Sequence, residues 1–263
     1  MPAVERLRIY PVKGLDGIEL DEAGLTPGGT LAGDREFALF DGAGTFNAKQ
    51  SSRFHELSTT FDPGSGRFAV ETADGTDEEF HLRERTDRNR AEAWFVDFFE
   101  EPLELRHDES MGFVDRTTMG PSVVSTATLE TVAGWFDGMT VDGARRRLRA
   151  NVEISGVPAF WEDRFVGEAA PTFEAGGIRF EGVTPCGRCV VPSRDPDTGD
   201  PLPAFREQFV RKRRETFPEW ADESAFDHYF SLMLIARIPE QFRDGTLAVG
   251  DSVSVTAPAA DGK

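Results

Sequence analysis

The sequence predicts a mainly β protein of the α+β class, with two consecutive β-rich domains and a few peripheral helices. Two observations lead to this fold class. Turn-forming runs such as Pro27-Gly28-Gly29 and Asp41-Gly42-Ala43-Gly44 recur through the first third of the chain, and such spacing is typical of a meander or barrel of short strands. The chain also has 263 residues, 39% hydrophobic and 22 of them phenylalanine, which is enough for one large or two modest cores.

The first domain is expected over residues 1–108. Short strands are predicted from 4 to 85, followed by a helix that Thr86 caps. The helix places four apolar side chains at i, i+3, i+4 and i+7, and we interpret this stripe as core: Ala91, Trp94, Phe95 and Phe98. The polar stretch 107–112 is the best candidate for the domain boundary.

The second domain is expected over residues 109–257, with a tail at 258–263. A helix should begin near Ser125 and Thr126, because Leu129, Val132, Ala133 and Phe136 then form one stripe. Its first turn could face an anion, or Thr126 could simply cap the helix. Strands are predicted over 151–191 and 228–256, with a polar helix over 204–216.

The charge composition is strongly acidic. The chain carries 47 acidic and 29 basic residues, a net charge of −18, and only four of the basic residues are lysines. We interpret this as adaptation to a salt-filled cytoplasm, as in haloarchaea, where salt screens self-repulsion; the alternative is an ordinary acidic protein. The negative charge argues against nucleic acid as a partner.

No signal sequence or membrane span is recognisable. Met1-Pro2-Ala3-Val4-Glu5 leads directly into the first predicted strand, and no stretch of about 18 apolar residues occurs. We therefore expect a cytoplasmic protein without a membrane partner. No cysteine runs of the ferredoxin type are present either, so no iron–sulfur cluster is expected.

The two cysteines of the chain stand together in Thr184-Pro185-Cys186-Gly187-Arg188-Cys189. A pair at this spacing can be half a zinc site, a redox disulfide, a single metal ligand with a neighbour, or two buried small residues. Zinc would need more ligands than the four scattered histidines offer. A redox pair would need a helix start, whereas Asp195-Pro196-Asp197-Thr198-Gly199 predicts a turn.

Two basic clusters interrupt the acidic sequence. Residues 211–214 are expected to lie on the solvated face of the helix over 204–216. In the other cluster, alternation from Arg147 to Val152 predicts a strand, on which Arg147, Arg149 and Asn151 would share one face and could present both arginines to the same ligand.

The cysteine segment with the following turn resembles the signature of the MOSC domain family, which includes molybdenum cofactor sulfurase C-termini and amidoxime-reducing molybdoenzymes. Further segments agree and occur in family order: residues 9–15, 33–39 with 47–50, 147–152 and 247–253. The resemblance implies an N-terminal β-barrel-like domain followed by a MOSC β-barrel with peripheral helices.

The resemblance also implies a site for a single-pyranopterin molybdenum cofactor. It makes Cys189 the catalytic residue and the ligand of molybdenum, with Cys186 a neighbour. The residues implied to hold the cofactor's pterin and phosphate are Lys13, Gly14, Arg35, Ser125, Thr126, Arg149, Asn151 and Arg188. Gly14 stands where many relatives carry serine, so only its backbone amide can donate there. Arginine forks suit a phosphate, and Arg188 is expected to favour the thiolate of Cys189.

By the same resemblance the chain is expected to reduce N-hydroxylated small molecules by removing an oxygen atom, with electrons from a separate ferredoxin-type or flavoprotein-type donor. The alternative is a non-catalytic carrier of the cofactor, or of sulfur as a persulfide on Cys189. No pyridoxal phosphate domain is expected within 263 residues.

Overall fold

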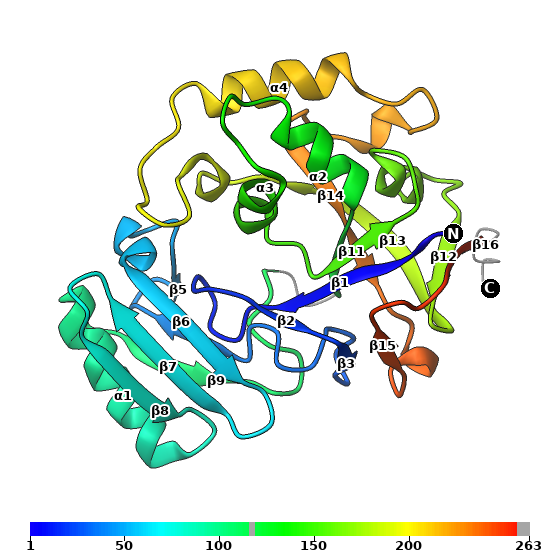
Figure 1. The fold of residues 1–263 in the computed structure, drawn as a ribbon. Coiled ribbons are helices and arrows are strands. Elements are labelled where there is room, and N and C mark those ends of the chain that lie inside the picture. Colours follow the sequence, from blue (N-terminus) through cyan, green and yellow to red (C-terminus); the bar gives the residue numbers. More distant parts are fainter. Residues whose placement is uncertain (116–118, 257–263) are drawn as a thin grey trace.

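The computed structural model describes residues 1–115 and 119–256, so the predicted tail at 258–263 lies outside the described residues. Over these described residues the structure is mainly β with four α-helices, which confirms the predicted fold class (Figure 1). The strands are β1 Ala3–Ile9, β2 Ile18–Leu20, β3 Glu22–Gly24, β4 Phe37–Phe40, β5 Thr45–Phe46, β6 Leu57–Asp62, β7 Arg67–Thr72, β8 Asp77–His81, β9 Glu104–His107, β10 Ser122–Ser125, β11 Val152–Ser155, β12 Thr172–Ala175, β13 Ile178–Gly187, β14 Ser231–Arg237, β15 Thr246–Ala248 and β16 Val253–Thr256. The α-helices are α1 Arg85–Phe99, α2 Thr126–Ala133, α3 Val141–Leu148 and α4 Phe205–Glu215, and the 3-10 helices are η1 Ser52–Glu56, η2 Trp161–Phe165, η3 Val191–Ser193, η4 Glu223–Ala225 and η5 Glu240–Phe242.

An eight-stranded sheet forms the larger part of the molecule. Its strand order is β16-β12-β13-β14-β10-β11-β1-β2, and the pairs are antiparallel except for β10 with β11. The first strand of the chain therefore belongs to this sheet: β1 lies between β11 and β2 (Figure 1). A further pairing of β3 with β15 joins the N-terminal segment to the C-terminal one.

The rest of the N-terminal half has two small sheets, β5-β4-β9 and β6-β7-β8, with α1 packed beside them (Figure 1). The predicted apolar stripe of α1 joins this core, with Ala91 and Phe95 buried and Trp94 and Phe98 partly buried against it. The predicted cap is wrong, because the helix begins at Arg85 and Thr86 lies inside its first turn.

The predicted strand through Arg147 and Arg149 is also wrong. Arg147 lies in α3, Arg149 ends that helix in the left-handed conformation (φ 58°), and the strand begins only at Val152. Helical propensity explains the difference: Ala144 and Leu148 supply the buried face of α3, while arginine is a good helix former.

The helix predicted over 204–216 is confirmed as α4. The prediction that residues 211–214 all lie on its solvated face is wrong. Arg213 is completely buried and forms an ion pair with buried Asp163 of η2 at 2.5 Å. The guanidinium also lies over the ring of Phe160, 4.6 Å from its centroid. Local sequence patterns could not predict this contact, because Asp163 is 50 residues away along the chain.

Candidate functional site

A cavity of about 300 Å³ lies where the N-terminal half meets the large sheet. The N-terminal half contributes the loop after β1, Arg35 before β4, and the loop after β5; the second half contributes the end of α3 and the cysteine loop after β13. Of the residues expected at the site, the structure brings together Lys13, Gly14, Arg35, Arg149, Asn151, Arg188 and Cys189, with Cys186.

Ser125 and Thr126 do not line this cavity. Ser125 is fully buried and is itself the N-cap of α2, because its hydroxyl accepts from the Thr128 amide at 3.1 Å. The hydroxyl of Thr126 donates to Glu153 at 2.9 Å, so the cap is Ser125 and not Thr126. The first turn of α2 is therefore occupied by the protein's own groups and is not placed to hold the cofactor.

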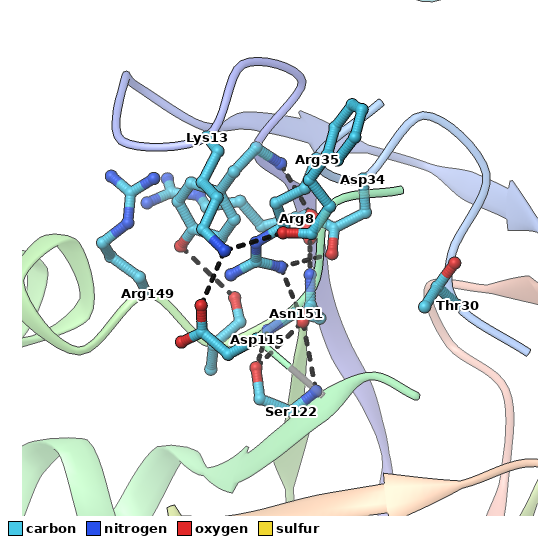
Figure 2. Close-up of polar contacts among 12 residues, drawn as sticks. Arg8, Lys13, Thr30, Asp34, Arg35, Asp115, Ser122, Arg149 and Asn151 are labelled. Carbon is cyan, nitrogen blue, oxygen red and sulfur yellow. Dashed lines mark hydrogen bonds and ion pairs between the residues drawn. The ribbon is translucent and has the colours of Figure 1, made fainter. Parts of the chain in front are cut away.

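Lys13 reaches the mouth of the cavity from the loop after β1. Its ammonium donates to the Phe113 carbonyl at 2.8 Å and pairs with the carboxylate of Asp115 at 2.6 Å (Figure 2). Lys49 approaches the same carboxylate at 3.5 Å. Burial raises the pKa of Asp115, but the hydrogen bond and charge of Lys13 outweigh it and hold the pKa below its ordinary value. An anion entering here would compete with this carboxylate for Lys13.

Arg35 is fixed by buried groups on two sides. Its guanidinium pairs with Asp34, whose side chain is 3% exposed, and donates to the amide oxygen of Asn151 at 3.2 Å (Figure 2). The same oxygen accepts from the Ser122 hydroxyl at 2.9 Å, while the amide nitrogen of Asn151 donates to the Arg8 carbonyl at 3.1 Å. Asn151 therefore positions Arg35 and joins β1 to β11.

Arg149 carries a charge without a carboxylate partner. Among the described residues its contacts are one hydrogen bond to the Leu15 carbonyl at 2.6 Å and the ring of Tyr10, whose centroid is 4.0 Å away. Burial lowers the pKa of Arg149 below its ordinary value, which means that its surroundings disfavour the charged form. A desolvated cation of this kind is stabilised when an anion binds beside it.

The backbone of the site is strained as well. Six non-glycine residues of the described chain have positive φ, and three of them line the cavity: Arg35 at 52°, Arg149 at 58° and Met233 at 74°. Left-handed backbone costs a non-glycine residue about 1–2 kcal/mol. Such strain persists only where surrounding contacts enforce it, and it gathers at functional sites.

The cysteine loop closes one side of the cavity. Cys186 is near the end of β13, Cys189 follows two residues after that strand, and both thiols are free and half-buried. The Arg188 guanidinium donates to Cys186 Sγ at 3.1 Å and to the Leu148 carbonyl at 3.0 Å. Its charge is thus placed at Cys186, whereas we expected it beside Cys189.

The alternative uses of the cysteines find little support. Only the short 3-10 turn η3 follows Cys189, and Cys186 lies in a strand, so neither begins an α-helix of the redox type. Within the described residues, the group with metal-ligand geometry is Glu36, His107 and Glu109, far from either cysteine in sequence. There Glu36 already pairs with Arg83 through both of its oxygens, at 2.8 and 2.9 Å.

The turn after the cysteines is tied to α3. The Asp195 carboxylate accepts from the amides of Asp197 and Thr198 at 3.0 and 3.2 Å, and it pairs with Arg147 at 3.2 Å. Asp195 therefore fixes the turn. Arg147, Lys49 and Asp115 also line the cavity; the sequence suggested Arg147 only as a strand neighbour of Arg149 facing the same ligand, and it did not assign Lys49 or Asp115 to the site. Arg147 and Lys49 lie in segments that carry the family resemblance, but no sequence signal marks Asp115.

The donor set fits a phosphate-bearing heterocyclic ligand. Lys13, Lys49, Arg35, Arg147, Arg149 and Arg188 all line the cavity, and Arg149 and Arg188 have no carboxylate partner among the described residues. The walls between these cations include Phe113, Met119 and Ile235, which can pack on a flat ring. Concentrated positive charge beside two thiols is unusual for a chain with a net charge of −18.

Comparison with known proteins agrees with these features. The family model described as "MOSC N-terminal beta barrel domain" matches residues 1–109, and the one described as "MOSC domain" matches residues 121–254. The chain is similar to the "Molybdenum cofactor sulfurase" of Caenorhabditis briggsae, with 23% identity over 252 residues that cover 86% of this chain and 34% of that protein. It thus spans about a third of the length of this relative. The chain belongs to the MOSC domain family, which is associated with molybdenum cofactor binding, and it carries the N-terminal beta barrel domain ahead of the MOSC domain.

Proposed function

We propose that the chain binds a molybdenum cofactor in the 300 Å³ cavity and reduces N-hydroxylated small molecules. The observation that supports this proposal best is the coincidence, in one cavity, of a half-buried cysteine with six cationic side chains, of which Arg149 and Arg188 have no carboxylate partner among the described residues. A thiolate ligates a soft or high-valent metal, and guanidinium groups recognise phosphate. Apolar side chains, among them Phe113, Met119 and Ile235, line the same cavity.

Each residue has a distinct part in this proposal. Cys189 would hold the metal, and Lys13, Arg35 and Arg149 would hold the phosphate and the polar edge of the pterin. Asn151 would keep Arg35 oriented. Its amide oxygen already accepts hydrogen bonds from protein donors and would therefore not contact the ligand. When bound, the cofactor supplies the two-electron redox chemistry that the side chains cannot perform. A separate protein would deliver the electrons, and the chain would act in the cytoplasm.

When the cofactor binds, its phosphate would replace Asp115 as the partner of Lys13. In the structure the Asp115 carboxylate accepts from Lys13 at 2.6 Å, and it is 67% exposed. An entering phosphate would take over Lys13 while the Asp115 side chain turned into solvent. Because the Asp115 carboxylate is largely exposed and can turn to solvent, exchanging it for a phosphate at Lys13, whose own side chain is 14% exposed, would cost little.

A second candidate is a carrier that holds the cofactor, or sulfur as a persulfide, without catalysing reduction. The name of the Caenorhabditis briggsae relative favours it. The persulfide would stand on Cys189, whereas Arg188 donates to Cys186 Sγ at 3.1 Å, so this contact does not distinguish the carrier from the reductase.

Metal analysis and turnover separate these functions. We expect the protein purified from its native host to contain molybdenum and to reduce benzamidoxime with an artificial reductant. Cys189→Ser should abolish turnover, whereas Cys186→Ser, its matched control, should retain most of it. Bound molybdenum without turnover would favour the carrier. Equal loss from both substitutions would contradict the assignment of Cys189 as the single protein thiolate on the metal.

A further inference from the structure

A second cavity, of about 250 Å³, adjoins the first. The two share Gly14, Arg147, Arg149 and Val191 as a common wall. The remaining walls of the second cavity come from the β1–β2 loop, η1 and the start of β6 on one side, and from α3 and the turn after η3 on the other. The proposed cofactor site makes no use of these remaining walls.

Basic side chains far outnumber acidic ones in the lining of the second cavity. Five arginines and a histidine line it: Arg8, Arg146, Arg147, Arg149, Arg194 and His55. The lining has a single carboxylate, Asp16, and that group already accepts from the Thr59 amide at 3.1 Å. Although the chain is acidic overall, a fifth of its 25 arginines line this one small cavity.

These arginines are not all neutralised by the protein. Three of them have carboxylate partners outside the lining: Arg8 pairs with Glu19 at 2.7 Å, and Arg146 and Arg147 pair with the turn aspartates at 2.5 and 3.2 Å. Arg149 and Arg194 are different. Among the described residues they bond only to main-chain carbonyls, those of Leu15 at 2.6 Å and Ala48 at 2.9 Å.

Some buried side-chain nitrogen atoms of the lining also have no hydrogen-bond partner. Two buried donor atoms of the lining, Nε of Arg8 and Nε of Arg147, have no partner in the described part of the chain. Nε2 of His55 has none either, but it is an acceptor in the neutral ring, whose Nδ1 donates to the Pro196 carbonyl at 3.4 Å. A buried donor without a partner costs about 1–3 kcal/mol, and native proteins leave few of them. The two arginine donors add to the capacity of this lining to bind an anionic ligand that offers acceptor oxygens.

We infer that this second cavity binds a phosphoryl group, separate from the phosphate of the cofactor. The acceptor oxygens of a phosphoryl group and its up to two negative charges match the guanidinium groups that line this cavity. Among the described residues Arg194 has no carboxylate partner, and Arg149, which also has none, is shared with the proposed cofactor site. A carboxylate would offer only two oxygens to this set. A polynucleotide would bring its phosphates to a surface of net charge −18, which would repel it.

The phosphoryl group could be free inorganic phosphate or the end of an organic monoester that extends along the shared wall towards the first cavity. Both would be recognised by the same guanidinium groups, so measured affinities must distinguish the two. Inorganic phosphate and glycerol 3-phosphate serve as the two probes. Calorimetric titration of the full chain as purified, at one fixed potassium chloride concentration, measures the affinity for each.

Arg194 is the residue to change, because it lines the second cavity and not the first. We expect Arg194→Gln to weaken binding of the preferred probe by about tenfold or more, since a charge-assisted hydrogen bond is lost. Arg194→Lys keeps the charge but lacks the planar guanidinium fork, so its affinity for the probe should lie between those of the unsubstituted protein and Arg194→Gln. This graded result would not be expected if the substitutions simply disturbed folding. The matched control Arg211→Gln, on the exposed side of α4, should bind like the unsubstituted protein.

Lys13→Met separates this inference from the proposed function, because Lys13 lines only the first cavity. It should lower molybdenum content and leave binding of the probe unchanged. Tighter binding of glycerol 3-phosphate would identify a larger ligand, and tighter binding of inorganic phosphate would identify a free anion. Equal affinities in Arg194→Gln and Arg211→Gln, or no binding of either probe, would overturn the inference.

Discussion

Replacing Arg213 by methionine tests the buried ion pair that joins α4 to η2. The Arg213 side chain is 0% exposed and its Asp163 partner is 3% exposed, with 2.5 Å between nitrogen and oxygen. Methionine has similar length and no charge, so it fills the space between the aromatic rings but leaves the Asp163 carboxylate buried without a counter-charge. The pair contributes nothing to the proposed cavities, so the effect should be on stability alone.

The expected loss follows from the cost of an uncompensated buried charge. Removing one partner of a buried pair typically costs about 3–5 kcal/mol. Burial already raises the pKa of Asp163 to about 6 even though Arg213 lowers it. Without Arg213 the carboxyl group should take up a proton more readily, so the loss should be largest near pH 8 and smaller near pH 5, where a neutral carboxyl relieves the penalty.

Urea unfolding at fixed potassium chloride concentration measures this free energy at both pH values. Arg211→Met on the exposed side of α4 is the matched control, and we expect a change within about 0.5 kcal/mol. Adding Asp163→Asn to Arg213→Met should restore part of the stability, because it removes the unpaired charge. A loss below about 1 kcal/mol for Arg213→Met, or one equal to the control, would refute this reasoning.

Three further predictions concern the cofactor, the pH and the salt. Arg149→Lys should lower molybdenum occupancy, measured by mass spectrometry of the metal, because lysine lacks the planar fork, and Arg211→Lys should not; full occupancy in both would show that the phosphate site is misplaced. Burial raises the pKa of Glu162 to about 8, so this carboxyl stays protonated in the folded protein while the unfolded chain releases its proton above its ordinary pKa, and stability should fall as pH rises towards 8. Glu162→Gln should flatten that fall in thermal unfolding, and an unchanged pH profile would contradict the assignment. Finally, the surplus of 47 acidic over 29 basic residues should make the unfolding midpoint rise between 0.1 M and 1 M potassium chloride, as the Debye length shrinks from about 10 to 3 Å; a flat or falling midpoint would remove the halophilic interpretation.

None of the described helices is long and apolar enough to cross a membrane, in keeping with the absence of such a stretch noted in the sequence. The broad β architecture could also be predicted, because turn residues and alternating apolar positions act locally. The same is true of α1 and α4, whose apolar side chains repeat at the helical period. Family motifs selected the loop after β1, Arg35, the end of α3 and the cysteine loop, and all of these meet at one cavity.

The amino-acid sequence shows which chemical groups are available: two cysteines close together, few lysines, and arginines in short clusters. What each of these groups contacts depends on the folded structure. Arg213 is buried because Asp163 lies opposite it, Arg188 is directed to Cys186, and Ser125 is occupied as a helix cap. Arg149 and Arg194, which have no carboxylate partner among the described residues, bond to carbonyls of distant segments. The partners of Arg213, Arg149 and Arg194 are 50, 134 and 146 residues away, and local sequence patterns carry no information about such separations.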